Sequence, residues 1–231
     1  GGRVDPAARD AVRRAVGLLH DGGHAVEEVD LPWDGQEVAD AYLLMYFGEV
    51  AAVCRRLQEV LGRAVRPGDV EDATFTMALL GESLAAADYA SLARRWNAVA
   101  RRFAAFHERY DLLLTPTTAH LPPRVGAHAP HGPELLAIRS LNGLRAGALL
   151  RRSGMVWAAA RRNLEAVPYT QVANLCGLPA MSVPLHQTEA PLPVGVQFVG
   201  RFGAEDVLFR LAAQLEQQAP WFERRPPGFR R

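Results

Sequence analysis

Helical spacing of large apolar residues marks most of the chain. Between positions 88 and 110 the spacing alternates between four and three, which predicts a helix that begins near Asp88 and turns one apolar side toward the core. The residues on that side are Leu92, Trp96, Val99, Phe103, Phe106 and Tyr110. Similar patterns predict helices over 5–22, 36–61, 71–84, 134–165 with a break near Ser153-Gly154, and 204–217.

The long segment 36–61 carries its large residues on one broad face. They are Tyr42, Met45, Tyr46, Val50, Val53 and Leu57. A face of this kind either packs in the core or lines a pocket, and core packing is the interpretation we favour.

Shorter apolar runs predict strands. Leu178–Leu185 and Val194–Val199 are apolar almost throughout and flank a turn-forming segment, which predicts a hairpin. Apolar runs without alternation are typical of strands that are covered on both faces. Segment 111–115 predicts a short strand that Pro116 ends, and segment 24–31, whose apolar residues lie among acidic ones, predicts an edge strand.

A short helix is predicted directly before the hairpin. Pro168 suits the first helical position because it lacks an N–H group, and Gly177 supplies the left-handed conformation that ends many helices, which places the helix at 169–176. Helices and strands together predict an α/β fold. The 231 residues contain 49% apolar residues and no repeat or linker, which predicts a single domain over 1–231.

Three motifs occur in the order that one known family has them. The string PYTxxxNxxGxPAxSVP begins at Pro168, and LPVGVQFVGR begins at Leu192 and precedes an amphipathic helix and Pro220-Trp221. YDLLLTPT begins at Tyr110, and 5–32 has the pattern of a helix followed by a strand. These segments resemble the C-terminal half of the amidase signature family, whose members hydrolyse carbon–nitrogen bonds of amides. The resemblance covers nearly the whole chain and implies a partial mixed sheet flanked by helices.

The residues that carry out the family's chemistry have no counterpart in this sequence. The resemblance implies a serine nucleophile, a second serine and a lysine base, the serines lying in a Gly/Ser-rich segment. All 26 basic residues here are arginine, and the five serines lie outside any glycine-rich loop. The chain, which opens with Gly1-Gly2 and a helix cap, is therefore predicted to be the C-terminal portion of an amidase, without catalytic residues and inactive alone. The alternative that stays open is a non-catalytic pseudoenzyme or binding module of the same fold.

In that role the chain would supply pocket walls for a small-molecule amide substrate. The candidates are polar residues at strand ends and helix starts, with one on the opposite wall: Thr115, Thr117, Tyr169, Thr170, Asn174 and Tyr46. Each has a local alternative, since Thr117 can cap the turn after Pro116 and Asn174 can bond the nearby backbone. Gln197, inside a predicted buried strand, is expected to be hydrogen-bonded and to join that strand to a loop.

No cofactor or metal site is predicted. His120, His128 and His131 share one loop, but that loop lacks the cysteine or carboxylate ligands that would complete a zinc site. Cys54 and Cys176 have no basic neighbour in the sequence and are interpreted as structural thiols.

Charge and composition limit the expected partners. A formal net charge of +1 gives no electrostatic reason to expect nucleic acid or an anionic membrane. With two distant cysteines, no signal peptide and no apolar run of membrane-spanning length, we expect a cytoplasmic protein. The expected partners are the amide substrate and the missing N-terminal catalytic segment. Apolar surface left uncovered by missing strands also predicts self-association.

Overall fold

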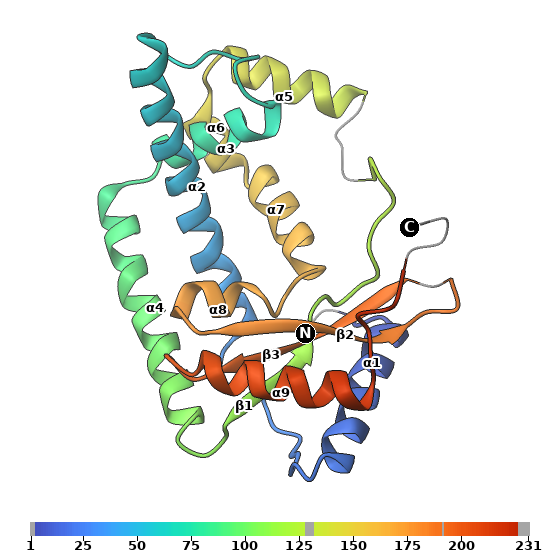
Figure 1. Cartoon of the computed structure of the whole chain (residues 1–231). Helices are drawn as coiled ribbons and strands as arrows, with labels where there is room; N and C mark the ends of the chain where they lie inside the picture. Colours follow the sequence, from blue (N-terminus) through green and yellow to red (C-terminus); the bar gives the residue numbers. More distant parts are fainter. Residues whose placement is uncertain (1–2, 128–131, 191, 226–231) are drawn as a thin grey trace. The chain divides into compact units, whose positions relative to one another are not determined.

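The computed structural model describes residues 3–127, 132–190 and 192–225, and the chain in it divides into two compact units (Figure 1). The sheet unit comprises Gly1–Val38, Asn97–Pro122 and Glu165–Arg231, and the helical unit comprises Ala39–Trp96 and Pro123–Leu164. The single domain expected over 1–231 stays a prediction.

The sheet unit is built on three strands in the order β1-β3-β2, with both pairings antiparallel. The strands are β1 (Leu112–Pro116), β2 (Ala180–Gln187) and β3 (Pro193–Gly200). This arrangement confirms the predicted α/β fold with a partial sheet flanked by helices. It also confirms the hairpin, since β2 and β3 are neighbours in both the sequence and the sheet. The sheet was expected to be mixed, whereas both pairings among the described strands are antiparallel.

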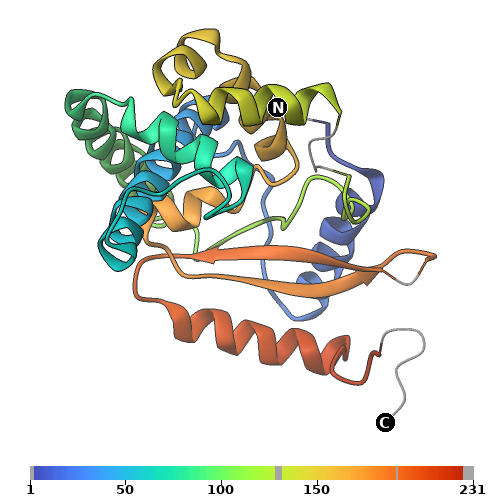
Figure 2. The ribbon, with the colours of Figure 1, turned by 90° about the horizontal axis from the view of Figure 1, so that it is seen from above.

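One face of this sheet is covered by α1 (Pro6–Asp21) and α9 (Glu205–Gln218), and α9 runs alongside the hairpin in both views (Figure 2). The core on this face contains Val196 and Phe198 of the central strand, packed against apolar residues of both helices. The side chain of Asp5 caps α1 by accepting a hydrogen bond from the Ala7 amide at 2.8 Å.

On the other face of the sheet, apolar packing covers the end that contains Leu113 and Val199. There Leu113 and Val199 pack against α8 (Gln171–Cys176) and the last turns of α4 (Ala86–Phe106). The stripe predicted on α4 is confirmed for Leu92, Trp96, Val99, Phe103 and Phe106, none of which is exposed. Tyr110 is not exposed either, but it follows the end of the helix at Phe106, so the helix is shorter than predicted.

The helical unit contains most of α2 (Gly35–Leu61) and the first half of α4. Its other helices are α3 (Asp72–Glu82), α5 (Pro133–Gly143), α6 (Gly147–Ser153) and α7 (Met155–Glu165). Phe47 of α2, Leu80 of α3 and Leu150 of α6 form its core. The break predicted at Gly154 is present, and a second break at 144–146, where Arg145 has a φ of 51°, was not predicted.

Helix α3 meets its neighbours where glycine lets two backbones touch. A Cβ atom at Gly81 would lie 2.6 Å from the carbonyl carbon of Phe47, and one at Gly147 would lie 2.9 Å from that of Leu79. Only glycine fits at such distances. A buried hydrogen bond of 2.8 Å from the Thr76 hydroxyl to the Asn142 side-chain oxygen also joins α3 to α5.

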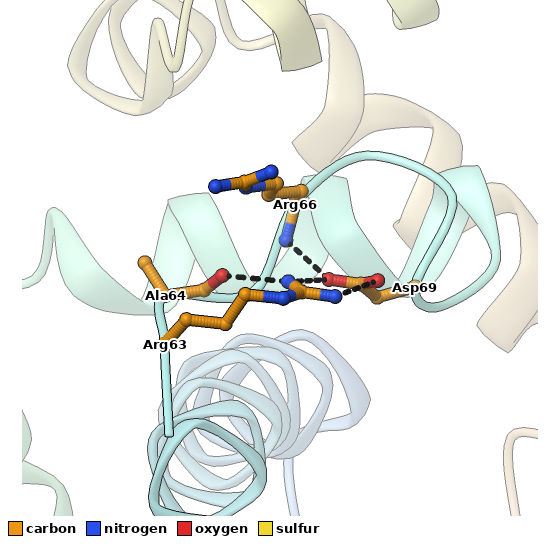
Figure 3. Close-up of polar contacts among 4 residues, drawn as sticks. All are labelled: Arg63, Ala64, Arg66 and Asp69. Carbon is orange, nitrogen blue, oxygen red and sulfur yellow. Dashed lines mark hydrogen bonds and ion pairs between the residues drawn. The ribbon is translucent and has the colours of Figure 1, made fainter. Parts of the chain in front are cut away.

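An arginine–aspartate pair organises the loop that connects α2 to α3 (Figure 3). The two terminal nitrogens of Arg63 donate to the two carboxylate oxygens of Asp69 at 2.7 and 2.9 Å, and the Arg66 amide donates to the same carboxylate at 2.8 Å. The hydrogen bonds from the Arg63 guanidinium have the largest influence and the bond from the Arg66 amide the next largest. Together they hold the pKa of Asp69 well below its usual range.

Some sequence-based expectations were wrong. Residues 24–31 form no strand, because no strand among the described residues pairs with them, and Val26 instead packs against the α1–α9 core from a loop. The short helix begins at Gln171 and not at Tyr169, although Gly177 ends it in the left-handed conformation as predicted. β3 is buried along most of its length, but Ala180 and Ser182 of β2 are exposed because β2 lies at an edge.

Candidate substrate-binding face

The register of the sheet gathers polar side chains on the face opposite α1 and α9. Thr115 is aligned with Gln197, which is aligned with Ser182 on the other side. One step further along, the Thr117 amide donates to the Gly195 carbonyl at 3.2 Å. Because alternate residues of a strand share a face, all five lie on one side of the sheet. This polar face is the candidate site.

Two hydroxyl groups are in direct contact on the polar face. The Thr117 Oγ1 and Ser182 Oγ atoms are 2.6 Å apart, bridging the outer strands across β3. Gly195 makes room for them, since a Cβ atom there would lie 2.5 Å from Ser182 Oγ and 2.8 Å from Thr117 Oγ1. Ser182 is exposed and Thr117 is half-buried, so solvent reaches the pair.

Gln197 has the structural role expected from the sequence. Its side chain is 5% exposed, and its Nε2 donates to the Tyr169 carbonyl at 3.1 Å, joining β3 to the segment before α8. A longer contact of 3.5 Å connects the same nitrogen to the Thr115 hydroxyl. Thr115 is itself buried, so its hydroxyl belongs to this internal network.

The remaining candidates of the sheet unit lie on or beside α8. Tyr169 is half-buried, and burial raises the pKa of its phenol, which keeps it neutral. The Thr170 hydroxyl donates weakly to the Val167 carbonyl at 3.4 Å, and Asn174 is exposed on the helix surface. The Gln197 bond to the Tyr169 carbonyl ties this segment to the polar face.

Tyr46, the sixth candidate, lies in the helical unit. Its ring stacks on that of Tyr42 with 6.0 Å between centroids, one helical turn away on α2. Its predicted place in a pocket wall therefore stays a prediction.

Sequence reasoning missed Ser182 and Gly195. Both lie inside strands that were interpreted as apolar runs, and only the antiparallel register brings them beside Thr117. The turn alone does not give this register, because the ladder is irregular between Val183 and His186. A regular pairing continued from Gln187 and Pro193 would place Ser182 opposite Phe198 instead of Gln197.

A separate open cavity of about 510 Å³ lies in the sheet unit, between α4, α8 and the turn after β3. Cys176, Glu108 and Arg201 contribute to its lining. Burial raises the pKa of the Cys176 thiol to about 11, so this thiol is protonated at neutral pH and is a poor nucleophile.

The described residues contain no group of three or more His, Cys, Asp or Glu side chains that could hold a metal ion. His120 is exposed, and His128 and His131 lie outside the described residues. In the part of the chain that the structure describes, no helix is both long and apolar enough to cross a membrane.

Comparison with known proteins places these features in a family. A family model described as Amidase matches residues 2–209. The lipoamidase of Enterococcus faecalis is 29% identical over 92% of this chain and 29% of its own length. The 6-aminohexanoate-cyclic-dimer hydrolase of Pseudomonas sp. strain NK87 is 28% identical over 96% of this chain and 42% of its own.

A comparison with solved structures also finds an amide hydrolase fold. The structure of a 6-aminohexanoate cyclic dimer hydrolase superposes with a TM-score of 0.77 and 26% identity, over 97% of this chain and 44% of that one. The chain thus spans less than half the length of the relatives it matches.

Proposed function

Because the chain belongs to the amidase family, we propose that it forms the C-terminal, substrate-binding part of an amide hydrolase and holds none of the catalytic residues. The observation that carries the proposal is the family match over residues 2–209 in a sequence without a single lysine. The lysine base that the resemblance implies cannot come from this chain. The relatives have additional length in which the serines and the lysine can lie.

The polar face is suited to hold an amide in place. Amide hydrolysis needs an activated nucleophile, a base and donors aimed at the developing oxyanion. The contribution of this chain is positioning: Thr117 and Ser182 offer solvent-accessible hydroxyls that can donate to a substrate carbonyl or accept from an amide N–H. Gln197 fixes the strand beneath them.

The other predicted wall residues complete the proposed site. Tyr169, Thr170 and Asn174 lie on the segment that Gln197 ties to the polar face. The pocket-lining role of Tyr46, which lies in the helical unit, stays a prediction. The substrate is a small-molecule amide. The partner is an N-terminal catalytic segment. We place the protein in the cytoplasm, where its two free cysteines would stay reduced.

The test is reconstitution. The purified chain should hydrolyse no aryl, aliphatic or cyclic amide, the last included because relatives act on a cyclic dimer. Co-expression with the N-terminal portion of a related amidase should restore hydrolysis, and replacing that segment's nucleophilic serine with alanine should abolish it. A well-folded complex with an intact serine and lysine that hydrolyses no amide would overturn the proposal.

Specificity gives a second measurement in the reconstituted enzyme. Ser182→Ala and Thr170→Ala should change KM for large amides more than kcat for the smallest one, because these residues position substrate and transfer no proton. Equal losses on every substrate would remove them from the site.

A non-catalytic binding module or pseudoenzyme of the same fold is the alternative, and the absence of lysine from the sequence fits it equally. The gene separates the two possibilities. An in-frame Gly/Ser-rich segment with a lysine, encoded upstream, supports the amidase, and its absence supports the binding module.

A further inference from the structure

Helix α2 has a stripe of apolar side chains that the described residues leave exposed. Tyr46, Val53 and Val60 are 41%, 66% and 79% exposed, although the face that contains Tyr46 and Val53 was expected to pack in the core. The three residues follow one another at intervals of seven, which is almost two helical turns, so they lie in line along one side of α2.

Two residues of opposite charge lie beside this stripe. Glu49 and Arg56 are also seven residues apart, both are exposed, and both lie next to the apolar line. The Tyr89 hydroxyl donates to one oxygen of Glu49 at 2.9 Å and holds that carboxylate in place. The second oxygen can accept a further bond.

The five residues are arranged nearly symmetrically about Val53. Tyr46 and Val60 stand seven residues before and after it, while Glu49 stands four before and Arg56 three after. When the helix is placed against an antiparallel copy of itself, Val53 meets Val53, Tyr46 meets Val60 and Glu49 meets Arg56. The two residues of each pair then lie at the same position along the helix axis to within one residue, about 1.5 Å.

We propose that this stripe of α2 is a self-association surface that binds a second copy of the chain in antiparallel orientation. Apolar residues at heptad spacing pack into the gaps of a facing helix, and charges beside the seam select the orientation. The antiparallel arrangement contains two Glu49–Arg56 pairs. In a parallel arrangement the charges of the two copies would lie on opposite sides of the seam, so neither Glu49–Arg56 pair would form.

This inference does not rest on the proposed amidase function. It gives Tyr46 a place in a protein interface instead of the pocket wall predicted from the sequence. If it is correct, substitutions at Tyr46 change the oligomeric state of the chain.

Sedimentation of the 231-residue chain between about 1 and 100 μM, the range of a weak transient interface, should show a concentration-dependent dimer. Val53→Glu should weaken dimerisation at least tenfold. The matched control is Phe209→Glu, which places the same charge on an exposed apolar position of α9 and should leave the dimer unchanged. A folded chain that stays monomeric throughout, or a dimer that withstands Val53→Glu, overturns the proposal.

Charge reversal tests the orientation. Glu49→Arg and Arg56→Glu should each weaken the dimer, because each creates two like-charge contacts. The double variant should restore it, since the two positions then carry exchanged charges that are again opposite in sign where they meet. A double variant that is weaker than either single one contradicts the antiparallel arrangement.

Disulfide cross-linking tests the same arrangement without measuring a monomer–dimer equilibrium, because the bond traps the dimer covalently. Val53→Cys should form an intermolecular disulfide on mild oxidation, because the two copies of this position meet at the symmetry axis. Val60→Cys, whose two copies would lie about 20 Å apart at 1.5 Å per residue, should form none. Equal cross-linking at both positions indicates non-specific contact and overturns the proposal.

Discussion

In the sheet unit a single strand runs through the core, with Val196 and Phe198 of β3 buried against α1 and α9, whereas in the helical unit the helices meet at glycines. The first core therefore depends on buried apolar volume. The second depends on backbones that approach each other closely at Gly81 and Gly147. The difference predicts that the two units tolerate opposite kinds of substitution: the sheet unit suffers most from lost atoms, and the helical unit from added ones.

Phe198→Ala should have the largest effect, because it removes a fully buried ring from the sheet core. Large-to-small changes of this kind cost about 3–5 kcal/mol of unfolding free energy. Hydrogen exchange should accelerate in the sheet strands and stay unchanged in α3 and α5. The exposed Phe209 serves as control, since Phe209→Ala should change stability by less than about 0.5 kcal/mol.

Gly81→Ala should come next and act on the helical unit. The added methyl group overlaps the backbone of Phe47, so α2 and α3 have to separate, at about 3 kcal/mol, the upper end of the usual range for overpacking. Chemical denaturation measures it. Gly143→Ala, with no atom within 4 Å of the new methyl group, should leave stability unchanged or raise it. Equal effects of the two substitutions would contradict the role of close approach.

Gly195→Ala should have a smaller effect and would show that the polar face of the sheet shares the helical unit's sensitivity to added atoms. The methyl group displaces the Thr117 and Ser182 hydroxyls and breaks their hydrogen bond, which contributes about 1 kcal/mol. Gly200→Ala on the same strand meets only ordinary contacts of 3.5 Å or more and should be milder. Stability measurements with both variants, and with Ser182→Ala, separate the hydroxyl contact from the strand itself.

The smallest of the expected effects is a loss of stability in acid, caused by loosening of the loop between α2 and α3. The pKa of Asp69 is lowered by the Arg63 guanidinium and the Arg66 amide, so its stabilising contribution is complete above the carboxyl's ordinary pKa of about 4 and is lost as pH falls below it. The stability difference between the wild type and Asp69→Asn should be constant above about pH 5, where the carboxyl is ionised in both states, and shrink toward pH 2. A difference that is independent of pH would show that the carboxylate charge is not involved.

An element could be predicted when the residues that determine it are close together in the sequence, and could not when it depends on contacts with distant residues. The α4 stripe, the hairpin and the end of α8 at Gly177 were foreseen because periodicity and glycine position are local. Segment 24–31 was misjudged because a strand needs a partner, and its composition could not show that none of the described strands pairs with it. The exposed side of α2 was misjudged for a similar reason, since periodicity identifies an apolar face without identifying what covers it.

The candidate site was foreseen in part. Thr117 was found because it follows a predicted strand, and the contact of Gln197 with the loop before α8 was expected. Ser182 and Gly195 lie beside Thr117 because of the irregular register of the hairpin and its pairing with β1, which lies well before the hairpin in the sequence. No local pattern contains that information.

The outer edge of β2 has a further consequence for the behaviour of the protein in concentrated solution. Exposed strand edges present unpaired backbone groups that can recruit strands from other molecules into aggregates. Here Pro184 has no N–H to offer, the ladder is irregular between Val183 and His186, and the Arg224 side chain donates to the Pro184 carbonyl at 2.9 Å. A foreign strand would find no donor at Pro184, and the Pro184 carbonyl already accepts one hydrogen bond. The hairpin therefore resists growth into a larger sheet, and molecules that meet along this edge can separate again.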